Sequence, residues 1–300
     1  MKTLRIGMIG LDTSHVTGLA ECFNESKSEF RVRGARIVKA YPGGSRTFSL
    51  SRDRVAGFST GLRDRYGVEL ADSLSELDGL DAYLLESVDG TQHLEQFRIL
   101  AEFGRPVYID KPLACGYDDA KRIFELAQEK QIPVMTASSM RFAAGVGDVL
   151  PPGAPVVAAD AFGPLAFLPD YRDYFWYGIH TAEILYRYLG CGCEQVRTIS
   201  HGPVELVIGF WRDGRVGQIS GNSAGCGNFG VRLVTENGHI VSVQNPEIPH
   251  LQPMASAILK FFRTGVSPID PAESLEIIAF LEAASRSRAA GGEPVELKTL

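Results

Sequence analysis

The sequence predicts an α/β domain with a doubly wound parallel sheet, followed by an α+β domain whose sheet is mostly antiparallel. Up to about residue 140, short apolar strands alternate with helical patterns, which is typical of βαβ units. After Pro151-Pro152-Gly153, the expected strands follow one another, and Asx-Gly pairs lie between them. We therefore expect two domains, residues 1–140 and residues 141–300.

The first domain is expected to alternate between strands and helices along the chain. Alanine, isoleucine and phenylalanine recur at helical spacing between Tyr117 and Lys130, and Gly104 closes the helix before it. The strands are expected at residues 4–9, 35–40, 80–85, 106–109 and 132–136, and the helices at residues 16–23, 93–103 and 117–130.

The second domain is expected to contain two hairpins. Asp213-Gly214 and Asn237-Gly238 are strong hairpin signals because both residues tolerate the positive φ angles of a tight turn. The strands are expected at residues 205–210, 215–220, 231–236 and 239–244, and the helices at residues 181–189, 253–263 and 272–284. In such two-domain chains, the cleft between the domains is the expected ligand site.

Composition excludes several classes of partner. The net charge of −6 argues against nucleic acid and anionic membranes, since both attract a basic surface. The chain has no apolar run of about eighteen residues and no signal-peptide pattern at its start. Its five cysteines are scattered, and Cys191-x-Cys193 has no second pair. We expect reduced thiols, a cytoplasmic location and no metal site.

The loop after the first strand resembles a dinucleotide-binding turn, but only in part. Gly10 keeps the first glycine of the Gly-x-Gly-x-x-Gly pattern, whereas Asp12 and His15 replace the second and third. One interpretation is that Asp12 or Thr13 caps the following helix. Ser14, the free helix N–H groups and His15 then receive a phosphate. The other is that the loop no longer binds a dinucleotide.

The end of the second strand bears on the choice of cofactor. The sequence there is Tyr41-Pro-Gly-Gly-Ser45-Arg46, without the acid that usually holds the ribose hydroxyls of NAD. Ser45 and Arg46 could accept a 2′-phosphate, which slightly favours NADP over NAD. Alternatively, Arg46 is only a solvated charge in a loop.

Residues 171–177 contain five aromatic side chains and suggest a substrate contact. Such a cluster suits a pocket wall that stacks on a sugar ring, with Arg172 available for an anionic group. A hydrophobic core or a subunit contact is an equal alternative.

Three segments resemble the glucose–fructose oxidoreductase/inositol dehydrogenase/MocA-like (Gfo/Idh/MocA) family. Residues 81–93 (DAYLLESVDGTQH) resemble its strand, loop and histidine, and residues 104–114 (GRPVYIDKPLA) are similar to its GKHVLCEKPLA signature. Residues 177–183 (YGIHTAE) resemble its G-x-H-x-x-D element, and residues 140–142 and 281–287 also match. The resemblance implies a Rossmann domain in residues 1–140 and a domain for substrate binding and oligomerisation in residues 141–300.

This resemblance implies an NAD(P)-dependent oxidoreductase that acts on a polyol, a sugar or a related small hydroxy or keto compound. Lys111 would lie beside the nicotinamide and donate to the substrate oxygen, while His180 shuttles the proton. Glu183, on the same helix face, would orient His180. The resemblance also implies a homodimer or homotetramer through the antiparallel sheet.

Further residues are carried over by position. Ser87, Val88 and Asp89 would pass beneath the nicotinamide ribose, His93 would start the next helix, and Asp110 precedes Lys111. The expected substrate residues are Arg141, Arg172, Trp176, Tyr177 and Glu183.

One position departs from the family pattern. Trp176 stands where the family commonly has an aspartate, four residues before the histidine. Two alternatives therefore stay open. One is a non-catalytic regulatory protein on the same fold that binds a nucleotide or a sugar. The other is a lyase or glycosidase that uses a tightly bound NAD for transient oxidation.

Overall fold

The computed structural model describes residues 2–297 and divides the chain into two compact units. The first unit takes the chain up to Ala137 together with Leu251–Asp270. The second takes Ser138–His250 together with the chain from Pro271 onward. In the described part of the chain, no helix is both long and apolar enough to span a membrane.

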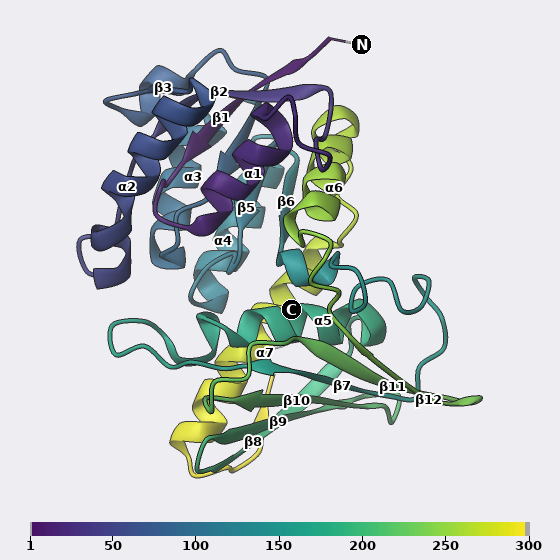
Figure 1. Cartoon of the computed structure of the whole chain (residues 1–300). Helices are drawn as coiled ribbons and strands as arrows, with labels where there is room; N and C mark the ends of the chain where they lie inside the picture. Colours follow the sequence, from purple (N-terminus) through teal and green to yellow (C-terminus); the bar gives the residue numbers. More distant parts are fainter. Residues whose placement is uncertain (1, 298–300) are drawn as a thin grey trace. The chain divides into compact units, whose positions relative to one another are not determined.

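The first unit is built on a six-stranded parallel sheet (Figure 1). Strand β1 lies between β2 and β4, so the connections reverse direction at its carboxyl end, where ligands bind in doubly wound folds. Five of the strands confirm predicted segments, and the two-residue β3 was not predicted. The order across the sheet is β3 (Glu69–Leu70), β2 (Ala35–Tyr41), β1 (Leu4–Ile9), β4 (Ala82–Leu85), β5 (Val107–Asp110) and β6 (Val134–Ala137).

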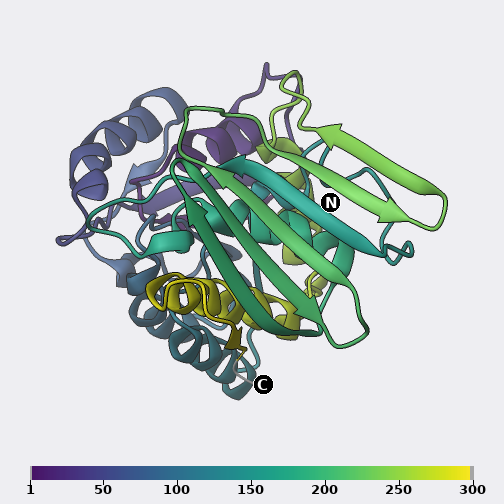
Figure 2. The same ribbon diagram turned by 90° about the horizontal axis from the view of Figure 1, so that it is seen from below.

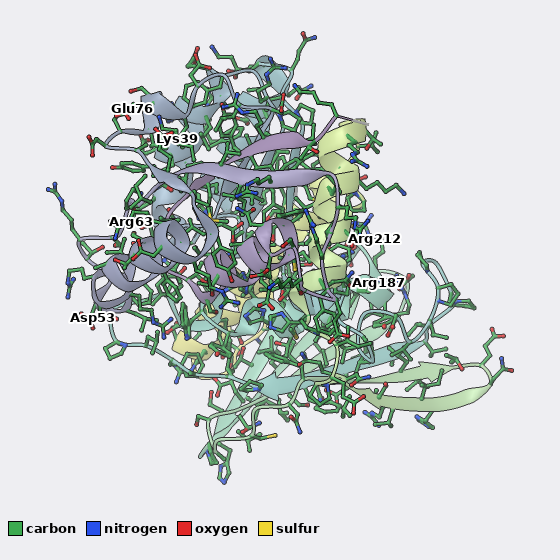
Figure 3. The ribbon with its side chains drawn as sticks, turned by 45° about the horizontal axis from the view of Figure 1, so that its top comes forward. Lys39, Asp53, Arg63, Glu76, Arg187 and Arg212 are labelled. Atoms are coloured by element: carbon green, nitrogen blue, oxygen red, sulfur yellow. The ribbon has the colours of Figure 1, made fainter. Side chains whose placement is uncertain are left out.

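Five α-helices belong to this unit, and one of them was not predicted. Helix α2 escaped prediction because it has two internal glycines and buries two serines, Ser51 and Ser59, so apolar residues do not recur along it. The helices are α1 (Ser14–Asn24), α2 (Ser49–Tyr66), α3 (His93–Ala101), α4 (Tyr117–Glu129) and α6 (Leu251–Thr264). Beside the edge strand β3, Lys39 Nζ of β2 lies 3.9 Å from Glu76 Oε2. Both residues are labelled in Figure 3.

Helix α6 packs beside α1, although more than 200 residues separate them in the sequence (Figure 1). Glycine at position 18 permits this approach, because a Cβ there would lie 2.2 Å from Leu251 Cδ1. The Tyr108 hydroxyl of β5 also lies 3.2 Å from the Met254 sulfur of α6. Helix α6 therefore completes the core of the first unit.

The second unit contains a seven-stranded sheet in which only β7 and β10 pair in parallel among the described residues (Figure 2). The order is β12 (Gly238–Val243), β11 (Gly230–Thr235), β7 (Ala158–Pro164), β10 (Val216–Asn222), β9 (Val204–Trp211), β8 (Cys193–His201) and β13 (Val295–Glu296). Both predicted hairpins are confirmed, with Gly214 at φ +87° and Gly238 at φ +123°. Strands β7, β8 and β13 were not predicted.

Helices α5 (Gly178–Leu189) and α7 (Pro271–Ala289) belong to the same unit. Helix α7 is fixed to β8, because Thr198 donates from its backbone N–H to Ser287 Oγ and from its hydroxyl to the Ala284 carbonyl. Arg187 of α5, labelled in Figure 3, donates to the carbonyls of Gly147 and Leu150 and so holds the segment before β7. The two hydrogen bonds from Arg187 help to position α5, which carries His180.

Candidate functional site

The carboxyl ends of β1, β4 and β5 assemble most of the predicted cofactor residues. These strands are neighbours in the sheet, so the residues that follow them meet at one edge. The strands lead into Gly10, Glu86 and Lys111, respectively, and Asp110 is the last residue of β5.

Gly10 makes the turn that the sequence assigned to it. Its φ angle of +80° suits glycine, and its N–H donates to the Tyr41 carbonyl at 3.1 Å. A Cβ at this position would lie 2.4 Å from the Ser87 Cα, so no other residue fits without displacing backbone. The first glycine of the pattern is therefore required by the close approach of the two loops.

Asp12 points into the protein instead of capping α1. Its carboxylate is fully buried and accepts from the Val88 N–H at 2.9 Å and from the Ser51 hydroxyl at 2.6 Å. Burial raises the pKa of Asp12, against the effect of these hydrogen bonds. The N-cap is Thr13, whose hydroxyl accepts from the His15 N–H at 3.4 Å, and Ser14 is exposed at the first residue of the helix.

Ser45 and Asp89 form a second link between loops. The Ser45 hydroxyl donates to Asp89 Oδ2 at 2.6 Å and accepts from the Phe48 N–H at 3.1 Å. Burial opposes ionisation of Asp89, but the hydrogen bonds from Ser45 and Thr91 together hold its pKa below its usual value. Of the two residues predicted for a 2′-phosphate, Ser45 is thus buried and bonded internally, whereas Arg46 is exposed.

His15, Glu86 and Asp110 form a buried cluster beside Lys111. The His15 Nδ1 lies 3.0 Å from the Asp110 carboxylate, and the Lys111 side chain is almost entirely buried. Burial lowers the pKa of Lys111, while the negative charges of Asp110 and Glu86 oppose that change. The peptide bond between Lys111 and Pro112 is cis.

His93 starts α3, as predicted, and links two loops. Its ring nitrogens lie 2.8 Å from the Ser87 carbonyl and 3.1 Å from the Leu113 carbonyl. The imidazole thus connects the loop after β4 with the turn that carries Lys111.

In the second unit, Ser138 fixes the orientation of His180. The Ser138 oxygen lies 2.6 Å from His180 Nδ1 and accepts from the Met140 N–H at 3.1 Å. The hydroxyl oxygen has two acceptor lone pairs, so it can accept from the Met140 N–H and from a proton on His180 Nδ1 together. A neutral His180 with its proton on Nδ1 leaves Nε2 free to accept a proton.

The Glu183 carboxylate bonds to Ser138 and Arg141, and Ser138 in turn contacts His180. Its carboxylate accepts from the Ser138 N–H at 3.1 Å and from Arg141 Nη1 at 3.1 Å, and Arg141 also pairs with Glu273. Glu183 lies one helical turn after His180, but Ser138 and Arg141 occupy its carboxylate. Burial raises the pKa of Glu183 to about 7, the Arg141 charge lowers it, and the Glu273 charge raises it further.

The aromatic run divides between core and partly exposed positions. Tyr174 and Phe175 belong to the core, and Tyr174 donates to Glu205 at 2.6 Å. Trp176 and Tyr177 are half-buried, with ring centroids 5.7 Å apart, and Tyr177 meets the His180 ring edge-on at 5.6 Å. Core positions and partly exposed positions thus occur in one segment. Arg172 is exposed.

Sequence reasoning missed Ser138 and Glu86. Glu86 gave a usable signal, because an acid that directly follows the apolar strand β4 lies at the ligand-binding edge of a parallel sheet. Ser138 gave none, since its role depends on a contact with a residue 42 positions away.

Solved structures share this fold over almost the whole chain. A myo-inositol dehydrogenase from Corynebacterium glutamicum is 15% identical, with a TM-score of 0.77, over 99% of this chain and 100% of that one. An oxidoreductase from Agrobacterium radiobacter, solved with NAD+, L-tartaric acid and magnesium, is 18% identical, with a TM-score of 0.74, over 98% of both chains. A myo-inositol dehydrogenase from Lactobacillus casei, solved with NAD(H) and myo-inositol, is 16% identical, with a TM-score of 0.73, over 99% and 98%.

The first unit also matches a family model. Residues 4–138 match the model GFO_IDH_MocA, described as an oxidoreductase family with an NAD-binding Rossmann fold. This match confirms the expected resemblance and the expectation of an oxidoreductase, and the solved structures confirm the predicted fold class. Residues 4–138, somewhat less than half of the chain, thus resemble the Gfo/Idh/MocA oxidoreductase family, whose model they match.

Proposed function

We propose that this protein transfers a hydride between a nicotinamide cofactor and a polyol, a sugar or a related small hydroxy or keto compound. The observation that carries the proposal is Lys111. This lysine is buried at the end of β5 in the unit that matches the NAD-binding family. A buried amine at the carboxyl end of a strand is suited to donate a hydrogen bond to the oxygen of the alcohol that reacts.

The residues around the start of α1 fit an anionic dinucleotide. The exposed Ser14 lies at the positive end of an eleven-residue helix, which favours a phosphate. Both oxygens of Asp12 accept hydrogen bonds inside the protein, so its carboxylate is not directed at that phosphate. Ser87, Val88 and Asp89 are proposed to contact the nicotinamide ribose, and the first unit would hold the cofactor.

The bound nicotinamide would supply the hydride acceptor or donor, and the protein would control the substrate oxygen and its proton. Lys111 donates a hydrogen bond to that oxygen and stabilises the charge that develops on it. His180 takes the proton of an alcohol or gives one to a ketone. In its neutral form, the ring can carry its proton on Nδ1, directed at the Ser138 oxygen, so that Nε2 is free to accept the alcohol proton. The imidazolium that results is the form that gives the Nε2 proton to a ketone in the reverse direction. Ser138 is therefore a positioning residue.

Further residues of the second unit are proposed to contact the substrate. Trp176 and Tyr177 are half-buried aromatic side chains that can stack on a sugar ring, and Arg172 is an exposed cation near them in sequence. Arg141 and Glu183 are bonded to each other and support the loop that carries Ser138.

Arg46 supports a preference for NADP. It is exposed after β2, and its carbonyl accepts from the Arg52 guanidinium at 2.8 Å, so two cationic side chains lie at this end of the sheet. A 2′-phosphate binds well between guanidinium groups. We expect Arg46→Gln to weaken NADPH binding more than NADH binding, whereas equal effects on both would remove this preference.

We also propose a cytoplasmic homodimer or homotetramer that contacts through the sheet of the second unit. One face of this sheet packs on α5 and α7, whereas several large apolar side chains on its strands are exposed, among them Ile199, Val204, Phe210 and Val241. All five cysteines are free thiols, which supports a reducing compartment. Light scattering tests the assembly, and a monomeric native protein would contradict it.

One set of contacts favours a non-catalytic binding protein on the same fold. Asp12, Ser51, Ser45 and Asp89 link the loops after β1, β2 and β4 by their own hydrogen bonds. These hydrogen bonds already join the loops beside which a dinucleotide would have to bind.

Fluorescence titration with NADH and NADPH separates these functions. The proposed function predicts saturable binding of at least one cofactor, followed by its turnover in a screen of polyols and sugars. If neither cofactor binds at millimolar concentration, the dehydrogenase proposal is wrong. Tight binding without net reduction in the screen would instead indicate regulation or transient oxidation.

A further inference from the structure

Glu86 is a buried acid whose hydrogen-bonding capacity is unused. It directly follows β4 and has no exposed surface. Among the described residues, neither of its carboxylate oxygens has a hydrogen-bond partner. Each buried oxygen without a partner lowers the stability of the folded state by about 1–3 kcal/mol, or by more when the group is charged. A native protein that keeps two of them on one buried side chain requires an explanation.

The unused oxygens lie next to an imidazole nitrogen. One ligand atom each from His15, Glu86 and Asp110 can be chosen so that all three lie within 4.8 Å of one another. They come from the start of α1 and the carboxyl ends of β4 and β5, so the backbone of the sheet fixes their spacing.

A proton on Glu86 would not resolve this arrangement. It would create an O–H donor, but neither oxygen forms a hydrogen bond with an acceptor in the described structure. A metal ion, in contrast, binds several of these atoms at once. With bonds of about 2.0–2.2 Å, ligand atoms around one ion lie about 3–4.4 Å apart, close to the separations here.

We propose that His15, Glu86 and Asp110 bind a divalent transition-metal cation. One imidazole nitrogen with two carboxylates suits Zn²⁺ or Mn²⁺ better than Ca²⁺, which takes oxygen ligands. Three protein ligands leave at least one coordination position for water.

Calorimetric titration of the EDTA-treated full chain with Zn²⁺, Mn²⁺ and Mg²⁺, each alone, tests the site. We expect one equivalent of Zn²⁺ or Mn²⁺ to bind and Mg²⁺ to bind more weakly. Glu86→Gln and His15→Gln should each weaken binding by more than about tenfold. His239→Gln is the matched control, since His239 is exposed and should not change the affinity.

A spectroscopic probe covers the case in which a variant folds poorly. Co²⁺ added to the native chain should give the visible absorption of a nitrogen- and oxygen-ligated ion, and Zn²⁺ should displace it. The proposal is wrong if the native chain binds none of these ions, or if binding survives unchanged in well-folded Glu86→Gln and His15→Gln. The test measures metal and not turnover, so its failure is distinct from failure of the proposed dehydrogenase.

Discussion

The Asp12 carboxylate accepts a hydrogen bond from the Val88 backbone N–H at 2.9 Å, which joins the loop after β1 to the loop after β4. An acid thus stands where the Gly-x-Gly-x-x-Gly pattern has its second glycine, and its carboxylate is used inside the protein. Asp12 links the two loops, while Thr13 supplies the cap of α1.

This link predicts that Asp12 contributes to stability. Asp12→Ala should lower the free energy of unfolding by about 1–3 kcal/mol, since the Val88 N–H and the Ser51 hydroxyl lose their buried acceptor. Asp12→Asn should lower the free energy of unfolding by less, because asparagine keeps one acceptor oxygen. Urea denaturation measures both, with exposed Asp53→Ala as the control.

In the cofactor titration, Asp12→Gly should weaken binding, and tighter binding would show that the carboxylate opposes the phosphate.

Lys111 should be required for turnover and not for cofactor binding. Lys111→Met removes the donor to the substrate oxygen and should reduce kcat by about a hundred- to ten-thousand-fold. Steady-state kinetics on any substrate found in the screen measures this loss. Lys121→Met, at an exposed position of α4, is the matched control. Normal turnover by Lys111→Met would exclude the proposed role.

Ser138 should set the tautomer of His180. Ser138→Ala removes the acceptor 2.6 Å from Nδ1, so nitrogen NMR of the labelled imidazole should report a larger fraction with the proton on Nε2. We expect kcat to fall about tenfold while cofactor affinity stays unchanged. Ser138→Thr keeps a hydroxyl and should restore both readouts. Ser139→Ala is the control, because Ser139 contacts His250 instead. An unchanged tautomer in Ser138→Ala would contradict this role.

Glu183 should make stability fall as pH rises. Its pKa is about 7 in the folded protein against an ordinary value of 4.5. The folded state therefore binds the proton more tightly, and the free energy of unfolding should decrease between pH 4.5 and 7 by about 3 kcal/mol. Below this window both states are protonated, and above it the loss is complete.

Urea denaturation at pH 5 and pH 8 measures this effect. Glu183→Gln cannot ionise, so the difference in stability between the two pH values should shrink, whereas exposed Glu21→Gln should leave it unchanged. If the native protein and Glu183→Gln show the same pH dependence, ionisation of Glu183 does not control stability.

Local signals were sufficient for most of the fold. The strand at residues 4–9 was predicted with its observed bounds, because a buried parallel strand is a short apolar run that a glycine ends. The two hairpins followed from Asx-Gly turns. Helix α2 was missed because its buried positions include serines that bond to other loops, and hydropathy does not report such contacts.

Long-range contacts limited prediction of the site. The sequence predicted Lys111 and His180 through motifs, and it assigned the orientation of His180 to Glu183 on the same helix. The structure adds a contact to His180 from Ser138, in a segment that only folding brings close. Asp12 was considered as a cap because a cap is a local contact, whereas its partners Ser51 and Val88 lie 39 and 76 residues away.

The return of α6 to the first unit has a consequence for how the protein is made. During synthesis, the strands up to Ala137 leave the ribosome long before Leu251–Asp270 does. The face of α1 that packs against Leu251 stays exposed while more than a hundred residues of the other unit are translated. The nascent nucleotide-binding half is therefore a candidate client for chaperones, and a gene fragment that stops at residue 137 should yield an aggregation-prone product.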